Sequence, residues 1–281
     1  MIPNISAIDA LILGILQGLT EFLPISSSGH LIVVEKLLKL NPEMLKSFDV
    51  SVHFGTLLAI IVYFRKDITD LLKAAFSIIS DPKGRKVSHE NKEKRKLLLY
   101  LVIGTIPAVV VGLLWGDLLD ELFRNPVSVA MLFVAVGLAF ILIEFIHRRR
   151  TEAKIDLNRA IVIGAAQAIA LIPGVSRSGA TICAGLAQGV KREESARFSF
   201  LLGSVAIAAA TALSVYQVAK GKVLLPEVGI TMIGVVSSFL SGLLAITFLM
   251  KFLKKHSLNI FGYYRIIVGA AIILLMWPAA S

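Results

Sequence analysis

The chain has few of the residues that stabilise or charge a soluble protein. Its 281 residues include a single cysteine, Cys183, which excludes an internal disulfide framework. Charged residues make up only 17%, hydrophobic residues reach 56%, and the mean hydropathy is +0.81. A water-soluble globule does not fit this composition, which is typical of a membrane protein with several spans. The N-terminal apolar run also lacks a basic leader, so no cleavable signal peptide is expected.

Acidic residues are scarce as well, with 19 against 29 basic ones and a net charge of +10. Such a surplus can indicate nucleic-acid binding, but here the basic residues lie in loops between apolar runs, so no nucleic-acid partner is expected. Loop 65–96 holds ten Lys and Arg residues, loop 147–159 holds five, and loops 188–197 and 251–257 hold three each, against six in all other loops. The positive-inside rule therefore places these four loops in the cytoplasm.

The apolar runs predict an all-α polytopic integral membrane protein with a single membrane domain, residues 1–281. Six runs are long enough to cross a bilayer, at about 48–64, 97–115, 127–146, 198–217, 228–250 and 260–277.

Two further segments repeat each other 150 positions apart. They are Gly14–His30, GILQGLTEFLPISSSGH, and Gly164–Ala180, GAAQAIALIPGVSRSGA. Each is an apolar run broken by proline and then by a Ser/Gly cluster. Duplicated broken segments of this kind build sites at membrane depth. The alignment matches Gly14, Gln17, Ser26, Ser28 and Gly29 with Gly164, Gln167, Ser176, Ser178 and Gly179.

The orientation of the spans determines what these segments can be. The chain enters residue 160 from the cytoplasm and is still cytoplasmic near residue 197, so the second segment must return to the side from which it came. It is either a re-entrant hairpin or two short spans, and the apolar stretch after Ser178 ends at Lys191, too short for a comfortable span. We therefore predict two re-entrant helical hairpins, with broken tips buried in protein or lining a wet cavity. Because the two segments enter from opposite sides, we expect an inverted-topology repeat with halves of about 1–146 and 160–281.

The first copy carries candidate catalytic groups. Gln17 and Glu21 lie four residues apart and share a helix face, and an unpaired carboxylate inside an apolar run is costly, which favours a functional role. Ser26 and Ser27 follow Pro24 at the start of a new helix, where hydroxyl and amide groups suit an anion. His30 falls one turn further, and a serine beside a histidine is the minimum for an activated nucleophile.

The second copy adds a cation. Arg177 lies between Ser176 and Ser178, with apolar sequence on both sides. Its guanidinium suits two phosphate oxygens, and Glu21 is the expected buried counter-ion. Thr181, one turn further, could add a hydroxyl. The two copies together indicate an oxyanion site, with phosphate as the favoured ligand.

The sequence does not decide the roles of two other polar residues. His53 lies early in an apolar run, where it either faces the predicted cavity or packs in the core. Arg265 lies in the last run, as a lining charge or as a residue reaching to the interface.

The motifs resemble those of a known family. GLTEFLPISSSGH, with Gln17 and Glu21, is similar to the (E/Q)xxxE and PxSSxGH signature of the bacterial undecaprenyl-diphosphate phosphatases, the bacitracin-resistance family. PGVSRSGAT, residues 173–181, resembles that family's PGxSRSxxT motif, and the resemblance extends over the whole chain. Gln17 fills a place often held by Glu, which leaves Glu21 as the main carboxylate.

The resemblance implies an enzyme of the bacterial cytoplasmic (inner) membrane, among membrane lipids, that hydrolyses undecaprenyl diphosphate to the monophosphate carrier lipid for cell-wall synthesis. It also implies a divalent cation, Mg²⁺ or Ca²⁺, with Glu21 and Gln17 as its candidate ligands, and is compatible with a homodimer. Ser27 is the expected nucleophile, with His30 as its base or leaving-group acid, or as the rival nucleophile, and with Glu21 orienting His30 or holding the cation. The implied site comprises Gln17, Glu21, Ser26, Ser27, His30, Ser176, Arg177, Ser178 and Thr181.

Two alternatives stay open at this point. An inverted repeat with broken helices also suits a lipid-phosphate or oxyanion transporter, which would want Arg177 and the serines but would not need a nucleophile. The Ser28-Gly29-His30 element also occurs in the unrelated type-2 phosphatidic acid phosphatases, although their Lys-x6-Arg-Pro signature is not evident here.

Overall fold

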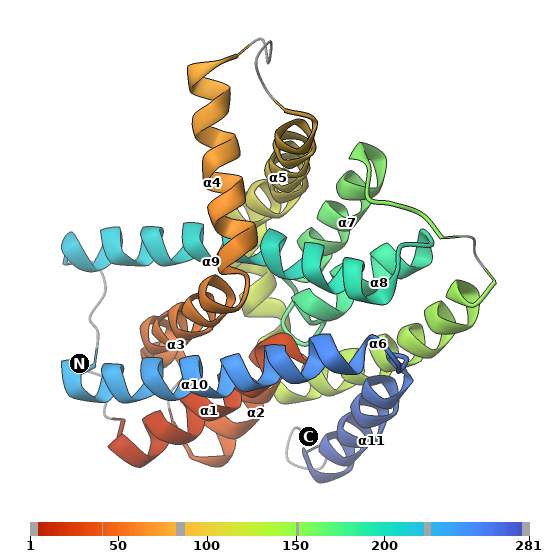
Figure 1. Cartoon of the computed structure of the whole chain (residues 1–281). Coiled ribbons are helices and arrows are strands. Elements are labelled where there is room, and N and C mark those ends of the chain that lie inside the picture. The colour runs from red at the N-terminus through yellow and green to blue at the C-terminus, as the bar shows by residue number, and fades with distance from the viewer. Residues whose placement is uncertain (1–4, 41, 83–87, 150–151, 222–225, 277–281) are drawn as a thin grey trace.

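The computed structural model describes residues 5–40, 42–82, 88–149, 152–221 and 226–276, and this part of the chain is built from helices (Figure 1). A single isolated bridge, between Ala153 and Val190, is its only described β-type pairing. The all-α prediction is therefore confirmed. The helices are α1 (Ala7–Phe22), α2 (Ser27–Leu37), α3 (Pro42–Tyr63), α4 (Arg65–Ser80), α5 (His89–Phe123), α6 (Pro126–His147), α7 (Leu157–Ile169), α8 (Arg177–Ala187), α9 (Arg192–Ala219), α10 (Val228–Phe252) and α11 (Asn259–Met276).

The long apolar helices agree with the predicted spans. Within the described residues, α5, α6, α9, α10 and α11 are each long and apolar enough to cross a membrane. The segment Ser47–Tyr63 of α3 passes the same test together with α4, with a bend of 85° between them. Each of the six predicted runs thus falls in a helix of its own, and the chain is a multi-pass membrane protein.

The region 65–96 differs from the loop that the charges predict. Residues 65–80 form α4, α5 starts at His89, and residues 83–87 lie outside the described part, as do 150–151 of the second basic loop. Polar contacts hold α4 in place: Lys94 pairs with Asp70 at 2.9 Å, and Arg197 of α9 pairs with Asp67. Because α4 is stabilised by ion pairs to its neighbours, its sequence is rich in charged residues. That composition is why the segment resembles a loop in the sequence.

The two repeated segments form two short helical hairpins, α1–α2 and α7–α8. Each turns at a serine in the left-handed region, Ser26 with φ 75° and Ser176 with φ 79°. The Ser26 Oγ accepts a hydrogen bond from the Gly29 amide at 3.3 Å, and the Ser176 Oγ accepts one from the Gly179 amide at 3.1 Å. A strained conformation that non-glycine residues rarely adopt is present twice at equivalent positions, so the duplication is local structure as well as sequence.

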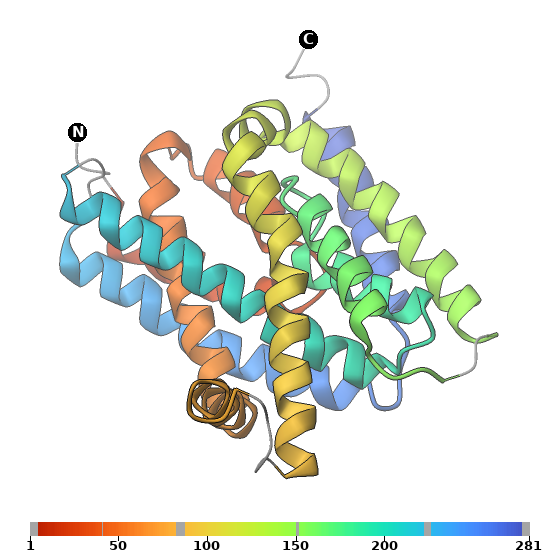
Figure 2. The ribbon, with the colours of Figure 1, turned by 90° about the horizontal axis from the view of Figure 1, so that it is seen from above.

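Each hairpin packs against a helix from the other half of the chain. Helix α1 lies along α10, and α7 lies along α5 (Figure 1, Figure 2). A Cβ atom on Gly14 would lie 2.0 Å from the Ser237 Oγ, and one on Gly164 would lie 2.3 Å from the Gly104 carbonyl oxygen. Glycines at equivalent positions thus let the backbones approach closely, as small residues do between membrane helices. This crossed packing brings the ends of both hairpins to the middle of the molecule.

Candidate active site

The broken ends of the two hairpins meet. We call residues 24–30 the first tip and residues 174–181 the second tip. Arg177 of the second tip donates a hydrogen bond from its Nη2 to the Glu21 Oε1, just before the first tip, at 2.5 Å. The Ser178 hydroxyl donates to the backbone oxygen of Glu21 at 3.1 Å. The predicted convergence of the tips, and of Glu21 with Arg177, is confirmed.

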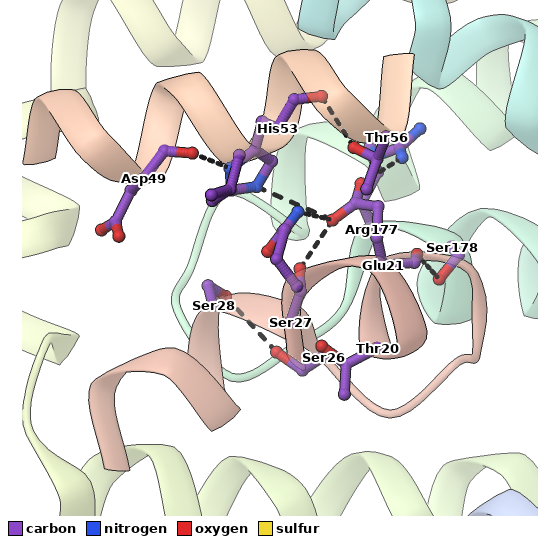
Figure 3. Close-up of polar contacts among 12 residues, drawn as sticks. Thr20, Glu21, Ser26, Ser27, Ser28, Asp49, His53, Thr56, Arg177 and Ser178 are labelled. Atoms are coloured by element: carbon purple, nitrogen blue, oxygen red, sulfur yellow. Dashed lines mark hydrogen bonds and ion pairs between the residues drawn. The ribbon is translucent and has the colours of Figure 1, made fainter. Parts of the chain in front are cut away.

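Glu21 is the centre of the polar contacts (Figure 3). It is only 6% exposed. Its Oε2 accepts hydrogen bonds from the Ser27 Oγ at 2.6 Å and from the Gln17 Nε2 at 3.0 Å. The His53 Nε2 lies 3.7 Å from the same oxygen. The buried carboxylate is thus fully partnered, and it links the proposed nucleophile to the arginine.

Arg177 occupies a space that a glycine leaves free. A Cβ atom on Gly203 of α9 would lie 0.9 Å from the Arg177 Nη1, so no larger residue fits beneath the guanidinium in this position. While Nη2 binds Glu21, the buried Nη1 has no hydrogen-bond partner among the described residues. Buried donors are normally paired, so this guanidinium nitrogen marks Arg177 as a candidate anion-binding group.

His30 lies one turn from Ser26, as the spacing predicts, but its ring is not bonded to the Ser27 hydroxyl. Its Nδ1 is 2.7 Å from the Ser26 backbone oxygen, and its Nε2 is 2.8 Å from the Tyr264 hydroxyl. The ring also packs against Phe133 and Tyr264. In this arrangement the described hydrogen bond of the Ser27 hydroxyl goes to Glu21 and not to His30. Aromatic packing on α6 and α11 turns the imidazole toward those helices, which spacing along α2 alone does not reveal.

The remaining serines and Thr181 take different positions. The Ser26 and Ser28 hydroxyls are 3.4 Å apart, and those of Ser176 and Ser178 are 3.3 Å apart. Thr181 is the last residue of the second tip, where its hydroxyl donates to the Arg177 backbone oxygen at 2.7 Å and lies 2.5 Å from the Ser199 Oγ. The serines therefore flank Arg177 and Ser27, whereas Thr181 contacts the Arg177 backbone.

Arg265, which the sequence left open, is fully buried between the two tips. It donates to the Gly174 backbone oxygen at 2.6 Å and to that of Pro24 at 3.4 Å. Its guanidinium carbon lies 4.9 Å from the centre of the Phe133 ring, so the charge is also stabilised by an aromatic face. Arg265 is a brace that joins the first tip to the second.

A cluster of charges beside the first tip was not predicted. The Arg124 Nη2 donates to the Asp49 Oδ2 at 2.9 Å and to the Glu35 Oε2 at 3.3 Å. Its only sequence signal is the spacing of Asp49 and His53, four residues apart on one helix face. A cavity of ≈ 260 Å³ lies here, lined by Ser28, Leu31, Asp49, Val50, His53 and Arg124.

The oxygens available to a divalent cation are few. Within the described residues there is no group of three or more His, Cys, Asp or Glu side chains that could hold a metal ion. The Gln17 Oε1 is buried without a partner beside Glu21. One carboxylate and one amide oxygen fit a Mg²⁺ ion whose other ligands are substrate phosphates and water.

The sequence as a whole matches a known family. Residues 10–271 match the family described as bacitracin resistance protein BacA. This chain belongs to the BacA family. An undecaprenyl-diphosphatase of Korarchaeum cryptofilum is 43% identical over 271 residues, which cover 95% of this chain and 98% of the relative. Another of Rubrobacter xylanophilus is 41% identical over 272 residues, covering 96% of this chain and 98% of the relative. BacA membership, predicted from the two tips, is therefore confirmed.

Proposed function

We propose that this chain hydrolyses undecaprenyl diphosphate to undecaprenyl phosphate and inorganic phosphate, recycling the carrier lipid for cell-wall synthesis and giving bacitracin resistance. The observation that carries the proposal is the hydrogen-bonded series from the Ser27 hydroxyl through Glu21 to Arg177, which joins two segments 150 residues apart. The names of the BacA relatives, undecaprenyl-diphosphatases matched over nearly their full length, give the substrate.

The geometry supports Ser27 as the nucleophile. Its hydroxyl donates to Glu21, so that carboxylate can accept the proton as the serine oxygen attacks the terminal phosphorus. The bond between that phosphorus and the bridging oxygen breaks, and undecaprenyl phosphate leaves. Water then attacks the phosphoserine, the Glu21 carboxyl returns its proton to the Ser27 oxygen as the phosphorus–serine bond breaks, and inorganic phosphate leaves with both hydrogens of the water.

Arg177 stabilises the group in transfer. Its Nη1 has no hydrogen-bond partner among the described residues, and a fixed cation beside developing charge is a large contribution to phosphoryl transfer. Gln17, Ser26, Ser176 and Ser178 complete the phosphate-binding shell, and Thr181 holds the Arg177 backbone. His30 is the alternative proton donor to the leaving group and the rival nucleophile, and either role requires the release of one of its two ring contacts.

A divalent cation, Mg²⁺ or Ca²⁺, is part of the proposal. Glu21 and Gln17 would hold it, with the diphosphate supplying further oxygens. When bound, such an ion neutralises charge on the phosphates.

The proposed location is the bacterial inner membrane, with the basic loops 65–96, 147–159, 188–197 and 251–257 in the cytoplasm. The crossed packing of the two hairpins supports an inverted repeat of halves 1–146 and 160–281. Membrane lipids and a second copy of the chain are the proposed partners besides the substrate.

Phosphate release from undecaprenyl diphosphate by the purified protein in detergent tests this function. An enzyme releases phosphate without a second compartment, and Ser27→Ala should abolish the release. A lipid-phosphate transporter on the same repeat would bind the substrate in detergent and release no phosphate, which would overturn the proposal.

A further inference from the structure

His53 is a polar residue at the site to which the BacA motifs give no role. It lies on α3, one turn after Asp49, and its side chain is 30% exposed toward the cavity of ≈ 260 Å³ beside the first tip. The Nε2 atom is 3.7 Å from the Glu21 Oε2, the oxygen that accepts from Ser27. The imidazole therefore lines the cavity and also faces the proposed catalytic carboxylate, and Figure 3 shows His53 beside Glu21.

The ring is held in one orientation. Its Nδ1 is 2.7 Å from the Asp49 backbone oxygen, and because a carbonyl oxygen only accepts, Nδ1 carries a proton. That contact fixes the ring so that Nε2 is the nitrogen facing Glu21. With or without a proton of its own, Nε2 can hydrogen-bond to a phosphate, as donor to an oxygen or as acceptor from a P–OH group.

The repeat supports a functional position. Residue 203 is equivalent to residue 53, and the space above Gly203 is filled by the guanidinium of Arg177. The two halves of the molecule thus place one nitrogen-bearing group on each side of the Glu21 carboxylate. Arg177 contacts Oε1, and His53 faces Oε2.

The cavity wall carries hydrogen-bond donors as well as a carboxylate. The Asp49 side chain is paired at 2.9 Å with Arg124, a cation that it shares with Glu35 at 3.3 Å and Asp120 at 3.6 Å. Ser28 adds a hydroxyl from the first tip. A phosphate placed here would meet Ser28 and His53, and Ser28 is the chain neighbour of Ser27.

We propose that His53 is a further catalytic residue that binds the terminal phosphate of the substrate through its Nε2, and that the cavity beside it receives this phosphate before and after transfer. The inference rests on the proposed diphosphatase function. The proposal gives the two phosphates of the substrate different positions. The terminal phosphate enters this cavity, and the phosphate attached to the prenyl chain does not.

Binding of two probes tests the proposal without turnover. The probes are a prenyl methylene-diphosphonate, which cannot be hydrolysed, and a prenyl monophosphate of the same chain length. Wild type should bind the diphosphonate more tightly, and His53→Ala should reduce this preference about tenfold or more, while monophosphate affinity changes less than about threefold. In turnover, His53→Ala should lower kcat/KM about 10- to 100-fold, with His53→Gln partly restored by its amide donor.

Control variants separate this role from a structural one. His256→Ala changes an exposed histidine near the end of α10 and should leave both probes and turnover unchanged. His53→Leu, which keeps most of the side-chain volume, replaces His53→Ala if that variant does not fold. A folded His53 variant with the wild-type diphosphonate preference and kcat/KM would overturn the proposal. A wild-type protein that binds the diphosphonate but releases no phosphate from undecaprenyl diphosphate would instead refute the diphosphatase function. The binding measurements would then still decide whether His53 binds the terminal phosphate.

Discussion

The first and second hairpins have the same backbone turn but carry different side chains where chemistry is needed. Position 27 is Ser in the first and Arg at 177 in the second, while Glu21 of the first corresponds to Leu171. The turn serines Ser26 and Ser176 have φ values of 75° and 79°. The two hairpins thus share a backbone but differ in their functional side chains. The first carries the proposed nucleophile and a carboxylate, and the second carries a cation.

The glutamines show the same division. Gln17 donates to Glu21 at 3.0 Å, whereas the equivalent Gln167 has no hydrogen-bond partner among the described residues for either side-chain polar atom. With Leu171 in place of a carboxylate, the second hairpin has no acceptor at the corresponding point. An active site between two similar halves needs this asymmetry, because attack on phosphorus requires a nucleophile on one side and positive charge on the other.

Removing the cation of the second hairpin should have the largest effect. Arg177→Ala should lower kcat/KM by about 10³-fold or more, because phosphoryl transfer loses its fixed positive charge. Arg177→Lys should restore little, since an ammonium cannot reproduce the two-pronged contact. Phosphate release in detergent gives the result, and retained folding is checked by the melting temperature. Near-normal turnover by the Lys variant would show that the Arg177 guanidinium does not act through two of its nitrogens at once.

Filling the space of Gly203 should have the next largest effect. In Gly203→Ala the new Cβ would lie 0.9 Å from the present position of the Arg177 Nη1, so the guanidinium must move away from Glu21. A displacement of about 1 Å can cost about 10²-fold in rate, and we expect a loss of 10- to 100-fold in kcat. Gly116→Ala is the matched control, because that helical glycine has nothing within 4 Å of its added Cβ. Equal activity of the two variants would contradict this packing.

Breaking the brace between the hairpins should reduce stability. Arg265→Met removes the donors to Gly174 and Pro24, and each buried carbonyl left unpaired costs about 1–3 kcal/mol. A lower melting temperature in detergent, together with lower activity, is the expected outcome. Unchanged stability would show that Arg265 does not hold the tips together.

The smallest effect is expected at Thr181. Its hydroxyl contacts the Arg177 backbone and Ser199, so Thr181→Val, which keeps the shape, should change kcat/KM less than about tenfold. A loss as large as that of Arg177→Ala would place Thr181 among the groups that touch substrate.

The sequence predicted the parts of the site that lie within the repeats. The Pro, Ser and Gly residues of both tips predicted broken helices, and Arg177 in an apolar setting predicted a buried counter-ion, which is Glu21. These features are local, or follow from the cost of burying one charge.

Other features depend on contacts between distant elements. The orientation of His30 follows from Tyr264, and the brace of Arg265 follows from where Gly174 and Pro24 lie in space. Helix α4 has a charged sequence because its partners are Lys94 and Arg197 on other helices. No spacing along the chain encodes such pairings.

Trapping the phosphorylated intermediate tests the central claim most directly. The protein is mixed with undecaprenyl diphosphate carrying a labelled terminal phosphate, quenched within one turnover and digested, and the labelled residue is identified. Phosphoserine survives mild acid, whereas phosphohistidine is lost in acid and survives base. Because the Ser27 hydroxyl is bound to Glu21 and both His30 nitrogens are engaged elsewhere, we predict acid-stable phosphate on Ser27. Acid-labile phosphate on His30, or near-normal activity of Ser27→Ala, would contradict the account.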